Sequence, residues 1–171
     1  LDVRDGNDGL NGSPLYKGIP FYINRLNNFV RVFAKAFNEG IIDGVDGAGH
    51  VDGIGLDNST GIRFFTITED GRNSISSADY LALPGATVED KYDNLTAKNF
   101  SVSSDVMTNY NVIASSDALN EKGNIVNLNA LLKMRHNISM FTEGAPEDYM
   151  KSLVASLGID SQQAVRMSSN Q

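Results

Sequence analysis

The clearest pattern along the chain is a run of apolar positions between residues 19 and 39. Apolar side chains recur there at heptad spacing, while asparagine, arginine and lysine take the other face. This pattern predicts an amphipathic helix with a broad buried face. Pro20 is tolerated in the first turn of a helix, and Gly40 stands where a helix ends. The positions on the apolar stripe are Ile19, Tyr22, Leu26, Phe29, Phe33 and Ala36.

A second helical pattern fills the end of the chain, from 146 to 171. Glu147 and Asp148 favour the positive N-terminal end of a helix, and Pro146 suits its first turn. Because its stripe and that of 19–39 are both too wide to leave in water, we expect the two helices to pack together. The stripe, which keeps heptad spacing around the polar Asp160, consists of Met150, Leu153, Leu157, Ala164 and Met167.

A shorter helix is predicted from 125 to about 135, with Asn124 as its cap and Leu131 among its apolar residues. Turn-forming residues predict a loop over 1–18 and a long glycine-rich loop over 40–61. Residues 80–83 fit either a short strand or a helical turn. β-forming residues predict short strands at 62–68, 99–103 and 110–114, the first of them followed by a turn at 69–72.

These elements predict an α+β fold, mainly a helical bundle with a small β-rich insert. We assign residues 1–49 and 115–171 to the helical bundle part and 50–114 to the irregular, β-rich part. The side chains expected to pack the core of the bundle are Ile19, Tyr22, Leu26, Phe29, Phe33, Leu131, Leu153 and Leu157.

Composition limits the classes of function. The chain has 171 residues and 41% hydrophobic content, enough for one domain with a real core. A net charge of −7 disfavours binding to a nucleic-acid backbone, and no apolar run is long enough to span a bilayer. Without cysteine there is no disulfide, thiolate chemistry or cysteine zinc site. Because the chain starts at Leu1 and ends at Gln171 in a polar stretch, we expect a segment of a longer protein.

The acidic, glycine-rich loop is the strongest candidate for a metal site, since oxygen-rich loops bind calcium. Its aspartates do not keep the EF-hand spacing: counted from Asp43, the sixth position is Ala48 and the twelfth is Ile54. His50 and His136 lie in separate elements without zinc-ligand spacing. We therefore expect a solvated loop and no metal ligand.

No pattern indicates an enzyme. The chain contains no nucleophile elbow, Walker motif or dinucleotide-binding glycine pattern, and its adjacent acidic residues lie in predicted turns. We therefore expect no catalytic residue and no bound cofactor.

Three stretches resemble the hook-associated proteins that join the flagellar hook to its filament, the FlgK family. The first is Leu1-Asp2-Val3-Arg4-Asp5, followed by Ile19-Pro20-Phe21-Tyr22 and, after the glycine loop, Phe64-Phe65. The second is Leu95-Thr96-Ala97-Lys98-Asn99-Phe100, followed by Ile113-Ala114-Ser115-Ser116. The third is Asn127-Leu128-Asn129-Ala130-Leu131, followed by Tyr149 to Gly158. The motifs occur in family order over more than half of the chain, whereas the stretch 70–95 departs from the family.

The resemblance implies a structural role in an adaptor ring outside the cell, reached by type III export, without catalysis or cofactor. It implies as partners the hook protein, the second junction protein, further copies of the same protein and an export chaperone, with no nucleic acid or membrane.

Two alternatives stay open. One is another flagellar axial protein such as flagellin, which the stretches at 95–99 and 153–158 disfavour. The other is a calcium-binding or adhesive bacterial surface module that uses the loop 43–57, which calcium titration calorimetry would distinguish.

Overall fold

The structure, a computed structural model, describes residues 17–169, so the loop expected over 1–18 falls almost entirely outside it. The α-helices are α1 (Ile19–Glu39), α2 (Ser77–Ala82), α3 (Val88–Lys91), α4 (Ser104–Thr108), α5 (Val126–Lys133) and α6 (Pro146–Ser169). Short 3₁₀ helices are η2 (His50–Asp52), η3 (Tyr92–Asn94), η4 (Tyr110–Val112) and η5 (Met134–His136). The strands are β1 (Phe65–Glu69), β2 (Asn73–Ser74) and β3 (Phe100–Val102). The fold is α+β and mostly helical, as the sequence predicts.

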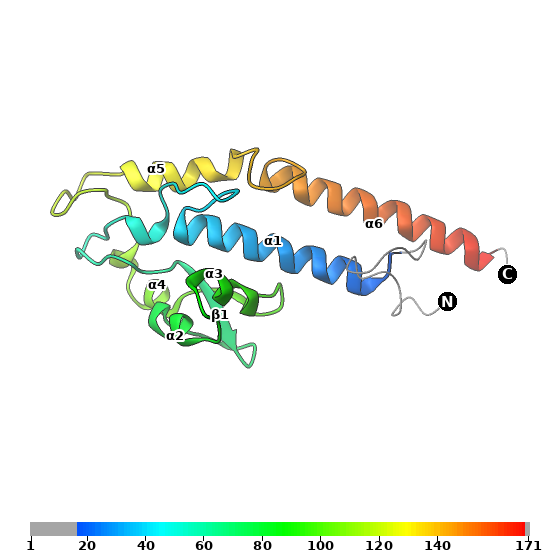
Figure 1. Cartoon of the computed structure of the whole chain (residues 1–171), viewed down its shortest axis with the longest axis horizontal. Helices are drawn as coiled ribbons and strands as arrows, with labels where there is room; N and C mark the ends of the chain where they lie inside the picture. Colours follow the sequence, from blue (N-terminus) through cyan, green and yellow to red (C-terminus); the bar gives the residue numbers. More distant parts are fainter. Residues whose placement is uncertain (1–16, 170–171) are drawn as a thin grey trace.

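The elements are arranged around α1, which runs through the middle of the molecule (Figure 1). α5 and α6 follow one another along one side of it, and α6 runs antiparallel to it. The sheet and the small helices α2 to α4 lie on the other side. The first turns of α1 and most of α6 extend beyond this β-rich part (Figure 1), and we call residues 19–26 and 149–169 the two-helix layer.

α1 ends at a glycine that no other residue could replace without strain. Gly40 has a φ of 72°, and its N–H donates to the carbonyl of Ala36 at 2.9 Å. A Cβ at Gly40 would lie 2.2 Å from the carbonyl oxygen of Gly47, because the returning loop crosses the helix end closely. The loop is therefore fixed against α1 from its first residues.

The sheet is antiparallel, with β1 between β2 and β3. The turn from β1 to β2 places Asp70 and Gly71 at φ of 50° and 70°, the values that a tight hairpin turn requires. Asn38 joins the sheet to α1, because its side-chain Nδ2 donates to the carbonyl of Phe65 at 2.7 Å and its Oδ1 accepts from the N–H of Phe65 at 2.9 Å.

Two buried clusters lie on opposite sides of α1. The cluster towards the sheet contains Val30, Ala34, Ile67, Ile75, Tyr80, Tyr92 and Leu95. The cluster towards α5 and α6 contains Ala36, Leu131, Met134, Met140, Phe141 and Tyr149. As predicted, α1 and α6 pack together, with the rings of Phe29 and Tyr149 5.6 Å apart.

The structure corrects the predicted core in the two-helix layer. Ile19 is 52% exposed and Leu157 is 47% exposed, so neither is a core residue. The reason is that the β-rich part covers α1 only further along, near Val30, while α6 turns only one side towards α1. Of the other predicted core residues, Leu131 and Leu153 are buried, whereas Tyr22, Leu26, Phe29 and Phe33 are half-buried.

The strand expected at 110–114 is wrong, since the chain forms the 3₁₀ helix η4 there. The side chain of Asn109 accepts a hydrogen bond from the N–H of Asn111 at 3.1 Å, which closes a turn in place of a strand. Of residues 80–83, for which a strand or a helical turn was expected, 80–82 form the end of helix α2. The other two strands form, at 65–69 and 100–102.

Asn124 lies next to the predicted helix start, although α5 begins at Val126. The N-cap of α5 is Ile125, so the predicted cap is off by one residue, although the Oδ1 of Asn124 accepts the N–H of Val126 at 3.0 Å. Within residues 17–169, no helix combines the length and apolar character needed to cross a bilayer.

Candidate functional site: a buried polar junction and an exposed apolar face

The acidic loop does not gather its carboxylates into one place. Asp52 accepts the N–H of Gly49 at 2.8 Å, and Asp57 accepts from Ser59 and Asn109 at 3.0 and 2.9 Å. Asp43 occupies a tight turn with a φ of 50°. Among the described residues, no group of three or more His, Cys, Asp or Glu side chains could hold a metal ion.

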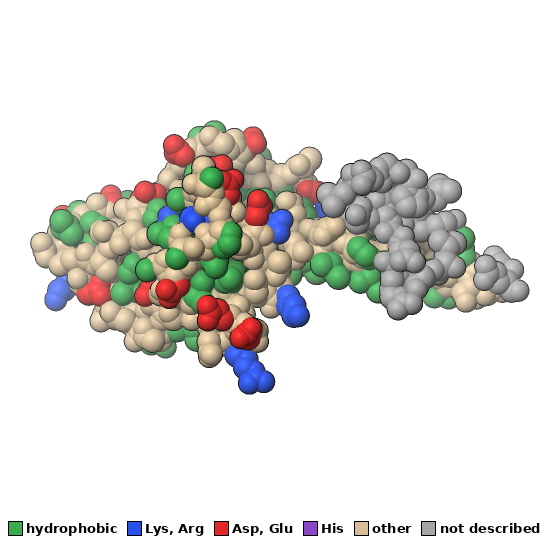
Figure 2. Space-filling model, turned by 60° about the horizontal axis from the view of Figure 1, so that its bottom comes forward, with side chains coloured by type: hydrophobic (Ala, Val, Ile, Leu, Met, Phe, Trp, Pro, Cys, Tyr) green, Lys and Arg blue, Asp and Glu red, His purple; other side chains and the backbone are tan. Residues whose placement is uncertain are grey.

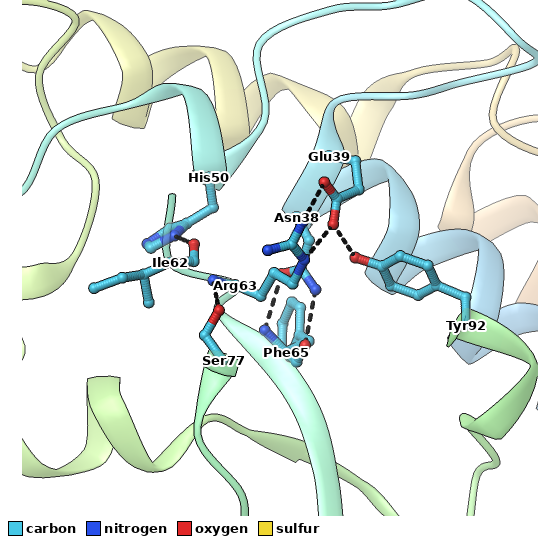
Figure 3. Close-up of polar contacts among 8 residues, drawn as sticks. All are labelled: Asn38, Glu39, His50, Ile62, Arg63, Phe65, Ser77 and Tyr92. Carbon is cyan, nitrogen blue, oxygen red and sulfur yellow. Dashed lines mark hydrogen bonds and ion pairs between the residues drawn. The ribbon is translucent and has the colours of Figure 1, made fainter. Parts of the chain in front are cut away.

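Glu39, Arg63 and Tyr92 form a buried polar junction where α1 ends against the β-rich part (Figure 3). Oε1 of Glu39 accepts from Nε of Arg63 at 2.6 Å and from the hydroxyl of Tyr92 at 2.7 Å, and Oε2 accepts from the second guanidinium nitrogen at 3.0 Å. The pair is bidentate, the geometry in which Arg–carboxylate bonds are strongest. It ties three segments that are far apart in the sequence.

Tyr92 in the junction and Tyr80, whose ring lies 5.5 Å from that of Tyr92, both resist losing their hydroxyl protons. Burial, followed by the negative charge of Glu39, raises the pKa of Tyr92 far above its usual value and raises that of Tyr80 as well. The hydroxyl of Tyr92 therefore stays a donor to Glu39 across the pH range in which proteins are stable.

His50 is held by the main chain on both ring nitrogens. Nδ1 lies 2.6 Å from the carbonyl oxygen of Ile62, and Nε2 accepts the N–H of Ala114 at 3.0 Å. His136, by contrast, is exposed on η5. The two histidines lie in separate elements, η2 and η5, and neither belongs to a group that could hold a metal ion among the described residues.

Grooves open on the surface formed by residues 17–169, and two of them have lining residues from more than one segment. The larger, about 560 Å³, lies between α1 and the loop before α6, with Arg25, Asp43, Glu143 and Tyr149 among its lining residues. Arg25 is already engaged, since it pairs with Glu143 at 2.5 Å and its guanidinium lies 4.5 Å from the centre of the Tyr149 ring. The smaller groove, about 250 Å³, is lined by loop residues around 55–58 and 115–122.

The two-helix layer carries an exposed apolar face. At 100° per residue, Ile19 and Ile23 continue the side of α1 that buries Val30 further along. On α6 the exposed Leu157 lies on the matching side, while the exposed Val154 and Val165 follow it on the side of α6 turned away from α1.

The two contributions lie on the same face of the layer. Tyr22 and Tyr149 mark the sides on which the helices meet, through the hydrogen bonds Tyr22–Asp160 and Tyr149–Arg25. Around the axis of α1, Ile23 is rotated by about 100° from Tyr22, and around the axis of α6, Leu157 is rotated by about 80° from Tyr149. Because the two helices run in opposite directions, these two rotations turn both side chains towards the same face of the layer. Figure 2 shows apolar side chains along this part of the molecule, next to the β-rich part.

Sequence reasoning missed the polar junction and the exposed face. Glu39 and Tyr92 are ordinary side chains in the sequence, 53 positions apart, and no spacing rule links them. The sequence did show the apolar stripes that form the exposed face. Periodicity, however, does not indicate which part of a stripe another element will cover.

No family model, curated protein or solved structure matches this chain. The resemblance to the hook-associated proteins therefore rests on the motifs in the sequence.

Proposed function

We propose that this chain is a structural segment of the bacterial flagellum, part of an adaptor at the junction between hook and filament. It acts outside the cell after type III export and contributes shape and contact surface, not catalysis, and it needs no cofactor. Its partners are other axial proteins, namely the hook protein, the second junction protein and further copies of itself, with an export chaperone before assembly.

The observation that carries the proposal is the exposed apolar face of the two-helix layer, in a chain whose motifs keep the order of an axial protein family. Ile19, Ile23 and Leu157 are about half exposed on one face, and the exposed Val165 lies near the end of α6 on its outer side. Exposed apolar residues that form a continuous surface are typical of protein contacts. An axial protein needs such a surface to join its neighbours.

The end of α6 supports the same role. Residues 161–169 are exposed on every side, although they keep helical structure. A short helix without tertiary contacts is only marginally stable in water, so such a helix gains most of its stability when another element packs on it. In an assembled structure a neighbouring axial protein would supply that contact.

The rest of the chain supplies rigidity. The aromatic rings of Phe29, Phe141 and Tyr149 pack between α1 and α6, with centroid separations of 4.6 to 5.6 Å. The polar junction at Glu39 fixes the β-rich part to the other end of α1. Both connections hold the exposed face at a fixed angle to the β-rich part.

Deleting the gene in the source organism tests the proposal. We expect cells that carry hooks without attached filaments, and complementation with the complete gene should restore filaments and motility. Immunogold labelling of this chain should mark the hook–filament junction alone. Labelling along the whole filament would instead indicate a flagellin-like role, and normal flagella after deletion would refute a flagellar function.

A pair of variants tests the apolar face in the complete protein. Ile23→Ser with Leu157→Ser should impair filament attachment while leaving the fold intact, because both side chains are exposed. Val88→Ser, which changes an exposed apolar residue on the β-rich part, is the matched control and should complement normally. Equal behaviour of the two proteins would show that the face is not an assembly surface.

A further inference from the structure

His50 joins three segments that are far apart in the sequence, one of which Asn127 and Leu128 of α5 also hold, through bonds to the carbonyls of Ala114 at 2.9 Å and Ser115 at 3.1 Å. It lies in η2, is 1% exposed, and bonds to main-chain groups at Ile62 and Ala114. Its ring packs against Phe37 of α1 and against Phe64, with centroids 6.3 and 5.4 Å away. One side chain thus connects the glycine loop, the start of the β-rich part and the segment after η4.

The two hydrogen bonds specify the charge state of the ring. A carbonyl oxygen only accepts, so Nδ1 carries the proton that is donated to Ile62. A main-chain N–H only donates, so Nε2 must be unprotonated to accept the bond from Ala114. The folded arrangement therefore requires a neutral imidazole, since a proton on Nε2 would face the N–H of Ala114 directly.

The charged groups on the elements around the ring are either paired or exposed. Arg63, after Ile62, pairs with Glu39 of α1, and Asp52 of η2 accepts the N–H of Gly49. On α5, which contacts η2 through Asn127, the charged residue is the exposed Lys133. Burial lowers the pKa of His50 below its ordinary value of 6.5, while the bond to Ile62 acts in the opposite direction.

We propose that His50 is an acid-sensitive latch: a proton on Nε2 breaks its bond to Ala114 and releases the segment 112–116 together with the loop 53–61. These two segments are joined to each other by the hydrogen bonds between Ile54 and Ser116, at 2.8 and 3.1 Å, so they open as a unit. The loops at this end of the molecule carry the exposed apolar residues Leu56, Tyr110 and Leu119. Opening loosens this end and leaves the packing of α1 on α6 in place.

The pH dependence follows from the neutral ring. At pH values well above 6.5 the ring is neutral in both the closed and the open state, so the latch contributes its full stability. As the pH falls below that value the open state takes up a proton first, and the opening equilibrium constant rises towards about tenfold per pH unit. The stability returns when the pH is raised again.

Amide hydrogen exchange on the whole chain, read by NMR at pH 7.5 and 5.5 and corrected for intrinsic rates, tests the latch. We expect protection factors at Ala114 and Ser116 to fall by about tenfold, while amides in the middle of α1, such as that of Phe33, keep theirs. Equal changes at all three positions, or none, would overturn the proposal.

Two variants separate His50 from every other titrating group. His50→Gln keeps an acceptor side chain without a titrating ring, so the tenfold change should disappear, whereas the exposed His136→Gln should retain it. If His50→Gln does not fold, nitrogen-15 spectra of the wild-type ring decide the matter. At pH 7.5 they should show the Nδ1–H tautomer, and the Nε2–H tautomer would overturn the proposal.

Discussion

Replacing Glu39 by Gln tests whether the buried polar junction holds the β-rich part against α1. The side chains of Arg63 and Glu39 are only 9% and 11% exposed, so the guanidinium depends on this carboxylate for its charge partner. Breaking a buried ion pair by removing one partner costs about 3–5 kcal/mol, because the remaining charge stays buried without compensation. The variant also weakens the acceptor for the hydroxyl of Tyr92, which lies 2.7 Å away.

A second variant separates the contribution of the Tyr92 hydrogen bond from that of the ion pair with Arg63. Tyr92→Phe removes one hydrogen bond to a charged group and should cost about 1.5–3 kcal/mol. In the double variant the two losses should not add, since both act on Glu39. Urea unfolding followed by far-ultraviolet circular dichroism measures these free energies, and the absence of tryptophan leaves tyrosine fluorescence as the second probe.

The exposed ion pair on α6 provides the control. Glu147 and Lys151 lie 2.8 Å apart with side chains 71% and 67% exposed, and Glu147→Gln should leave the urea midpoint unchanged. A loss below about 1 kcal/mol for Glu39→Gln, or a loss no larger than that of the control, would show that the junction does not stabilise the fold.

Phe29→Ala should cost about 3 kcal/mol in urea unfolding, the lower end for a core phenylalanine, because the ring is half-buried; a loss below about 1 kcal/mol would contradict its place in the aromatic packing. Gly53→Ala should lower the melting temperature, since a Cβ there would lie 2.1 Å from the Asn127 side chain, whereas Gly123→Ala meets nothing within 4 Å and should not. Millimolar calcium should leave the melting temperature unchanged, and a rise abolished by Asp43→Asn would reveal a metal site. In sedimentation equilibrium at micromolar concentration the chain should be a monomer, because a net charge of −7 repels other copies; a stable dimer or ring would show that copies of this segment assemble with no other part or partner.

The apolar periodicity was enough to predict the long helices. The apolar residues from Ile19 to Ala36 fall on one side only if the segment is an α-helix, with 3.6 residues per turn. Gly40, after this segment, adopts the left-handed conformation that ends the helix. The central strand β1 and its neighbour β3 were also visible, because β-branched and aromatic residues are concentrated there. These features depend on local chemistry, which the sequence contains in full.

The extent of burial could not be read from the same stripes. Leu153 and Leu157 are one turn apart on the predicted face of α6, yet the first is buried and the second is half exposed. The difference arises because helix α1 covers only one side of α6, and that limit is set by the position of a distant segment. Heptad spacing predicts which residues share a side of a helix but not how far its partner extends.

The buried polar contacts were decided by the tertiary structure alone. Glu39, Arg63 and Tyr92 meet across 24 and 53 positions of the chain, and His50 reaches a main-chain N–H 64 positions away. In the sequence each of these residues is compatible with a solvated loop or helix end. Only the fold excludes water from them, and without water each polar group must find its partner inside the protein. The sequence by itself therefore determined which elements form, while their packing determined which side chains are buried, paired and exposed.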